Sequence, residues 1–145
     1  MPRILIVDDN CDSRSVLAGL LERDGYKVGV AADGDEALKA QEKAPFDVLI
    51  TDIFMPVRDG VETIRAFHAR YPRTRIIAMS GDRRLASGDR RLAVDYLSLG
   101  LAIGADRILR KPFDLAALQT ALNEVLATRN LVASPATPLR RRDFA

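Results

Sequence analysis

The sequence lacks the features that mark secreted or membrane-spanning proteins. Cys11 is the only cysteine, so the chain cannot form an internal disulfide bond. Its apolar runs, such as residues 4–7, have the length of a strand, whereas roughly 20 apolar residues are needed to cross a bilayer. Residues 1–3 lead directly into a strand pattern, without a segment that resembles a secretory signal. We therefore expect a cytoplasmic protein without a membrane span.

The sequence also lacks an excess of charge of one sign. Its formal net charge is +2, and residues 128–145 carry four arginines against one aspartate, which leaves the rest of the chain close to neutral. A dedicated nucleic-acid-binding domain usually spreads basic residues over a whole face. We therefore expect no direct DNA-binding domain in this chain.

What the sequence does contain is enough apolar material for one core. Apolar residues make up 48% of the 145 residues, which is sufficient for a single globular domain. Apolar periodicity ends near residue 127, and the segment beyond it is rich in arginine and proline. The sequence predicts a domain at residues 1–127 and a flexible basic tail at residues 128–145.

Short apolar runs alternate with amphipathic segments along this domain. We predict strands at residues 3–7, 27–31, 46–51, 75–79 and 107–109. We predict helices from residue 13 to the stop at Gly25, and at residues 34–44, 61–71, 92–104 and 115–127. The segment 81–88 is polar and is predicted to be a long loop or a frayed helix start. Five strands alternating with five helices predict an α/β fold with a doubly wound, parallel five-stranded sheet.

Polar residues that can carry out chemistry follow four of the predicted strands. They are Asp8 with Asp9, Asp52, Ser80 and Lys111. In parallel α/β sheets, sites form at the carboxyl ends of the strands, so these residues are expected to converge at one edge. Three carboxylates brought together repel one another unless they hold a cation, and oxygen ligands select a hard ion such as Mg²⁺.

The same residues suit the transfer of a phosphoryl group. A carboxylate can act as a nucleophile and form an acyl phosphate, and Asp52 is the central candidate. Phosphoryl transfer requires charge neutralisation and hydrogen-bond donors around the phosphoryl oxygens. Lys111 and the metal ion would supply the charge, and Ser80 would supply a hydroxyl.

Four motifs resemble those of response-regulator receiver domains from two-component signal transduction, in the order and approximate spacing of that family. They are Asp8-Asp9-Asn10, Asp52-Ile53-Phe54-Met55-Pro56 with Asp59-Gly60, Met79-Ser80-Gly81, and Lys111-Pro112-Phe113. The resemblance covers residues 3 to about 127. It implies a flavodoxin-like (βα)5 fold with strand order 2-1-3-4-5.

The resemblance also implies a role for each site residue. Asp52 would be the phosphoacceptor. Asp9, Asp52 and the backbone carbonyl of Phe54 would be direct ligands of Mg²⁺ (or Mn²⁺), and Asp8 would hold a coordinated water. Lys111 would pair with the phosphoryl group, and the Ser80 hydroxyl would turn towards it. Pro112 resembles the cis-linked proline of the family.

The chain departs from the family pattern at three places. Ile108 stands where many receivers carry an aromatic residue that rotates inward when the hydroxyl moves. Phe54 is bulkier and less polar than the residue at that position in many relatives, which suggests slower attack by water. The loop after Ser80 is longer than usual and lies where the output surface normally sits, which suggests a changed partner surface.

The sequence therefore favours a signalling switch that accepts a phosphoryl group from a histidine kinase or phosphotransfer protein and alters binding to a downstream protein, as a monomer or a phosphorylation-dependent dimer. It is not expected to be an enzyme beyond its own phosphorylation and dephosphorylation. A haloacid dehalogenase-type hydrolase would need an acid at position 54, where Phe54 stands. A phosphorylation-independent scaffold and a receiver fragment of a longer regulator remain alternatives.

Overall fold

The computed structural model describes residues 2–53, 60–80 and 104–133. Its centre is a sheet of five parallel strands in the order β2-β1-β3-β4-β5, which confirms the predicted flavodoxin-like arrangement. The strands are β1 (Arg3–Val7), β2 (Lys27–Ala31), β3 (Val48–Asp52), β4 (Arg75–Ser80) and β5 (Arg107–Arg110). The helices in the described residues are α1 (Cys11–Arg23), α2 (Gly34–Lys43), α3 (Gly60–Arg70) and α6 (Leu115–Ala133).

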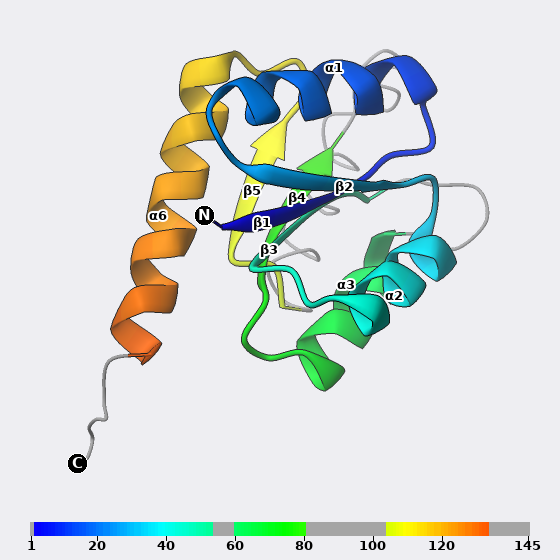
Figure 1. Cartoon of the computed structure of the whole chain (residues 1–145), viewed down its shortest axis with the longest axis vertical. Helices are drawn as coiled ribbons and strands as arrows, with labels where there is room; N and C mark the ends of the chain where they lie inside the picture. The colour runs from blue at the N-terminus through cyan, green and yellow to red at the C-terminus, as the bar shows by residue number, and fades with distance from the viewer. Residues whose placement is uncertain (1, 54–59, 81–103, 134–145) are drawn as a thin grey trace, which may run out of the picture.

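The helices form a layer on each face of the sheet (Figure 1). Helices α1 and α6 cover one face, and α2 and α3 cover the other. The apolar run of β1 is continuous because both faces of this strand are buried. Leu5 and Val7 pack towards α2 and α3. Ile4 and Ile6 pack towards α1 and α6. All five residues of β3 are buried. Strands buried on both faces read as unbroken apolar runs, which is the pattern seen in the sequence.

Helix α1 is fixed at both ends by local chemistry. Its N-cap is Asn10, whose side-chain oxygen accepts a hydrogen bond from the Ser13 backbone N–H at 2.9 Å. Its end lies next to Gly25, which has a φ of 95°, a left-handed conformation that favours glycine and supports the predicted stop. Only residues 8–10 separate β1 from α1, so the cap also sets the path of the Asp8-Asp9 turn.

The predicted end of the last helix was wrong. The sequence predicted a helix over residues 115–127 and a tail from residue 128, but α6 continues to Ala133. Apolar periodicity reports burial and not helix formation, and residues 128–133 contain neither proline nor glycine to stop the helix. The predicted helix at residues 92–104, the loop at 81–88 and the remainder of the tail lie outside the described residues.

None of the described helices is long and apolar enough to span a lipid bilayer.

Candidate functional site

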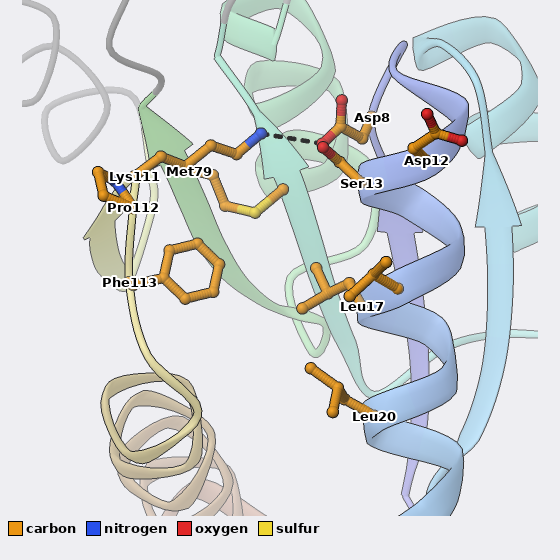
Figure 2. Close-up of a pocket in the computed structure, with 10 residues that line it drawn as sticks. Asp8, Asp12, Ser13, Leu17, Leu20, Met79, Lys111, Pro112 and Phe113 are labelled. Carbon is orange, nitrogen blue, oxygen red and sulfur yellow. Dashed lines mark hydrogen bonds and ion pairs between the residues drawn. The ribbon is translucent and has the colours of Figure 1, made fainter.

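The carboxyl ends of three strands bring an ammonium and two carboxylates together. Asp8 follows β1, Asp52 is the last residue of β3, and Lys111 follows β5. The Lys111 Nζ donates to Asp8 Oδ2 at 2.9 Å and to Asp52 Oδ2 at 3.1 Å. Figure 2 shows the Lys111 side chain extended along the strand ends towards Asp8. The predicted convergence is therefore present for these three residues, although they are separated by up to 103 positions in sequence.

Asp8 is fixed by hydrogen bonds of both its side chain and its backbone. Its carboxylate is almost fully buried, and its second oxygen, Oδ1, accepts a hydrogen bond from the Asn10 N–H at 2.9 Å. Its own N–H donates to the Ala31 carbonyl of β2 at 3.2 Å, which extends the sheet by one residue. Its carbonyl leaves the sheet and accepts a hydrogen bond from Arg14 Nη1 at 2.8 Å. Buried polar groups that are satisfied in this way hold a single geometry.

Asp9 completes a cluster of acids. Carboxylate oxygens of Asp8, Asp9 and Asp52 lie within 4.8 Å of one another, with Asp9 the most exposed of the three. With Lys111 included, the four side chains carry a formal charge of −2, which a divalent cation neutralises. Carboxylate oxygens are the ligands that Mg²⁺ and Mn²⁺ prefer. The residues present therefore fit a hard divalent cation.

The Lys111 ammonium remains charged in this setting. Burial acts to lower the pKa of Lys111, but Coulombic attraction to Asp52, hydrogen bonds to both carboxylates and attraction to Asp8 outweigh it. The result is a pKa raised above the ordinary 10.5. Lys111 thus provides a permanent positive charge beside Asp52 at neutral pH.

Asp52 lies deep in the fold, because β3 is the central strand of the sheet. The chain returns to it at the start of α3, where the Gly60 N–H donates to the Ile53 carbonyl at 2.8 Å. A Cβ atom on Gly60 would overlap the Asp52 carbonyl oxygen and crowd the Ile53 Cα. The predicted Asp59-Gly60 motif therefore has a steric role at its glycine, since this position brings two backbones into contact.

The remaining predicted site residues are described only in part. Ser80 is the last residue of β4 and pairs with Arg110 of β5, so its backbone lies at the same edge of the sheet. Its side chain and all of Phe54 lie outside the described residues. The bond between Lys111 and Pro112 is cis, as the resemblance implied. Ile108 is partly buried and packs against the core beneath α2 and α3.

Sequence reasoning missed two features of this edge. The first is Arg14, whose partner is a backbone carbonyl that any residue could supply, so no residue type signals the contact. The second is a groove of about 660 Å³ between α1 and the segment Lys111 to Phe113. Val16, Leu17 and Leu20 line it from α1, and Figure 2 shows Leu17 and Leu20 across the groove from Phe113. Its polar end is formed by Asp8, Asp12, Ser13 and Lys111.

Comparisons with known proteins agree with this fold. The sequence matches the family model of the response regulator receiver domain over residues 4–123, and the chain belongs to that family. Members of this class are signalling switches of two-component systems and not classical enzymes.

One curated relative and two solved structures illustrate the similarity. The transcriptional regulatory protein PrrA of Mycobacterium tuberculosis is 36% identical over 133 residues, which are 92% of this chain and 53% of PrrA. The chain thus spans about half the length of this relative. A receiver domain protein from Clostridium thermocellum superimposes with a TM-score of 0.79 at 28% identity, covering 91% of this chain and 99% of that one. The chemotaxis protein CheY4 of Vibrio cholerae gives a TM-score of 0.71 at 35% identity, with 86% and 98% covered.

Proposed function

We propose that this receiver is a phosphorylation-dependent switch in which Asp52 accepts a phosphoryl group from a phosphohistidine of a histidine kinase or phosphotransfer protein. The observation that carries the proposal is the bridge from Lys111 to both Asp8 and Asp52, with Asp9 beside it. This arrangement combines a carboxylate nucleophile with a fixed positive charge and a set of acids suited to a divalent cation.

The residues of the chain divide the chemistry among them. An Asp52 carboxylate oxygen attacks phosphorus while the bond from phosphorus to the donor nitrogen breaks, and the electron pair stays on that nitrogen. Lys111 moves from the Asp52 carboxylate to a phosphoryl oxygen and offsets its charge. The Ser80 hydroxyl donates to another phosphoryl oxygen.

A divalent cation completes this proposal. Asp9, Asp52 and the Phe54 carbonyl would hold Mg²⁺ or Mn²⁺ directly, and Asp8 would hold it through water. When bound, the ion neutralises negative charge on the phosphoryl oxygens. Asp8 suits the indirect role, because both of its oxygens already accept hydrogen bonds from Asn10 and Lys111.

The groove beside α1 supports a docking path for the phosphodonor. A donor histidine must reach Asp52 from outside, and the groove opens next to Lys111 and Asp8. Val16 is 63% exposed, and with Leu17 and Leu20 it forms a stripe at helical spacing along α1. We assign this groove to an amphipathic helix of the donor, with apolar side chains against the stripe and a basic residue near Asp12.

The test is direct phosphorylation. The protein is incubated with Mg²⁺ and acetyl phosphate, and its intact mass is recorded for the wild type, Asp52→Asn and Asp12→Asn. A gain of one phosphoryl mass (about 80 Da) in the wild type and Asp12→Asn, but not in Asp52→Asn, is expected. Asp12 is the matched control, since it is an exposed acid in the first turn of α1 outside the acid cluster. An unchanged wild-type mass, together with no response to beryllofluoride, would favour the phosphorylation-independent scaffold.

A further inference from the structure

We infer that Arg14 is a positioning residue for the divalent-cation site, acting through the peptide that joins Asp8 to Asp9. This inference rests on the proposed function, because it concerns the same site. Arg14 lies in the first turns of α1, and its Nη1 donates to the Asp8 carbonyl at 2.8 Å. It therefore ties the helix to the turn that carries both acids.

The contact matters because the chain leaves the sheet at this peptide. The Asp8 N–H still pairs with Ala31 of β2, but its carbonyl has turned away and has Arg14 as its partner. The orientation of that carbonyl fixes the plane of the peptide, and the plane sets the direction in which Asp9 leaves it. Arg14 is itself half-buried, which shields the hydrogen bond from water.

Asp9 depends on the backbone more than its neighbours do. Asp8 is fixed by its own side-chain hydrogen bonds, and Asp52 is fixed by Lys111 and by its place in β3. Within the described part of the chain, no hydrogen bond or ion pair holds the Asp9 carboxylate. Its position in the acid cluster is therefore set by the turn, and the turn is fastened by Asn10 at one point and by Arg14 at another.

Two possible roles of Arg14, as a nearby charge or as a positioning residue, predict opposite changes in cation affinity. If its guanidinium acted only as a nearby positive charge, its removal would strengthen cation binding, because like charges repel. If it acts by positioning, its removal weakens binding. Loss of a residue that orients a metal ligand typically costs about 10–100-fold in affinity. The sign of the change therefore decides between the two roles.

The experiment measures Mn²⁺ binding to the full chain by the EPR signal of free Mn²⁺. Arg14→Met removes the donor and the charge, and Arg14→Lys keeps a charge and a donor. We expect Kd to rise about tenfold in Arg14→Met and to recover in part in Arg14→Lys. Arg23→Met is the matched control, since Arg23 is an exposed arginine in the last turn of the same helix, and its Kd should equal that of the wild type.

A second readout separates positioning from a loss of folded protein. With acetyl phosphate as donor, Arg14→Met should need more Mg²⁺ for half-maximal phosphorylation but reach the wild-type rate when Mg²⁺ is saturating. An unfolded fraction would instead lower the final extent of phosphorylation at every Mg²⁺ concentration. If Arg14→Met does not fold, Arg14→Gln, which also removes the guanidinium donor and its charge, carries the same comparison.

An unchanged or lower Kd in the folded variant would overturn the role of Arg14 and leave the phosphorylation site intact. Absence of Mn²⁺ binding in the wild type would overturn this inference and the proposed cation site together. Asp9→Asn is the control for the site itself. If the wild type binds Mn²⁺ at the acid cluster, Asp9→Asn should lose that binding.

Discussion

The Lys111 ammonium bridges two carboxylates that come from different strands, at 2.9 Å from Asp8 Oδ2 and 3.1 Å from Asp52 Oδ2. Both acids are buried, whereas Lys111 is 25% exposed at its side chain. The bridge therefore compensates two buried negative charges at once. Its removal has consequences for stability, for pH dependence and for the response to cations.

Lys111→Met should destabilise the protein and make it more responsive to Mg²⁺. Leaving two buried carboxylates without their ammonium partner should lower the free energy of unfolding by about 1–3 kcal/mol in the absence of divalent cations. Because the lysine no longer competes for these oxygens, added Mg²⁺ should raise the Tm of the variant more than that of the wild type. Urea unfolding and thermal melts with and without Mg²⁺ test this. Lys39→Met, at an exposed lysine of α2, should change neither quantity.

The raised pKa of Lys111 predicts a loss of stability at high pH. A lysine whose pKa is higher in the folded than in the unfolded state stabilises the fold below the unfolded value, and this stabilisation disappears as the pH rises through the folded value. The window therefore begins near 10.5 and extends above it. The difference in urea midpoint between the wild type and Lys111→Met should shrink across this window. A constant difference from pH 9 upwards would contradict the ion pair as its source.

Gly60→Ala should damage both the fold and the site. A methyl group at this position overlaps backbone atoms of Asp52 and Ile53, which cannot move aside as a flexible side chain would. We expect a loss of roughly 1–3 kcal/mol of stability and slower phosphorylation by acetyl phosphate. Gly19→Ala is the control within α1, where nothing lies within 4 Å of the added methyl group. It should be neutral or stabilise by up to about 1 kcal/mol, because alanine favours a helix over glycine. Equal behaviour of the two variants would argue against the close approach.

Val16→Gln should slow transfer from a phosphorylated donor protein but not from acetyl phosphate. The substitution places an amide on the most exposed part of the apolar stripe, where a docked helix would bury it, and a small donor does not need that surface. Val30→Gln is the matched control, because Val30 is also an exposed valine, at 51%, but lies on β2 and does not line the groove. Rates of transfer measured with both donors give the comparison. A loss of transfer with acetyl phosphate would point to a defect in the site.

Local sequence patterns predicted much of this fold because they arise directly from the burial of the elements that they mark. The bounds of β1 and β2 match the predicted residues, since strands are marked by apolar runs between polar turns. Asp8, Asp52 and Lys111 were found because parallel strands bring their carboxyl ends to one edge, so positions in sequence translate into positions in space. The end of α6 was missed because the prediction followed apolar periodicity, whereas residues 128–133 continue the helix without a proline or glycine to stop it.

The features that escaped prediction depend on tertiary arrangement. The hydrogen bond of Arg14 joins a side chain to a backbone carbonyl, and only the path of the turn brings the two together. The groove exists because Phe113 and α1 lie on the same face of the sheet, although they are about 100 positions apart in sequence. The packing of Ile108 likewise shows which face its side chain takes, which the sequence left open.

Asp52 ends a strand whose residues are all buried, and Asp8 follows another strand that lies beside it in the centre of the sheet. The proposed phosphoryl acceptor is therefore part of the same cooperative unit as the core, and a partly unfolded chain would have no acceptor to offer. The amount of protein able to receive a signal then equals the amount that is folded. Any substitution in the core that lowers the folded fraction should therefore lower, in the same proportion, the amount of protein that can be phosphorylated. This holds even when the substitution lies far from the site.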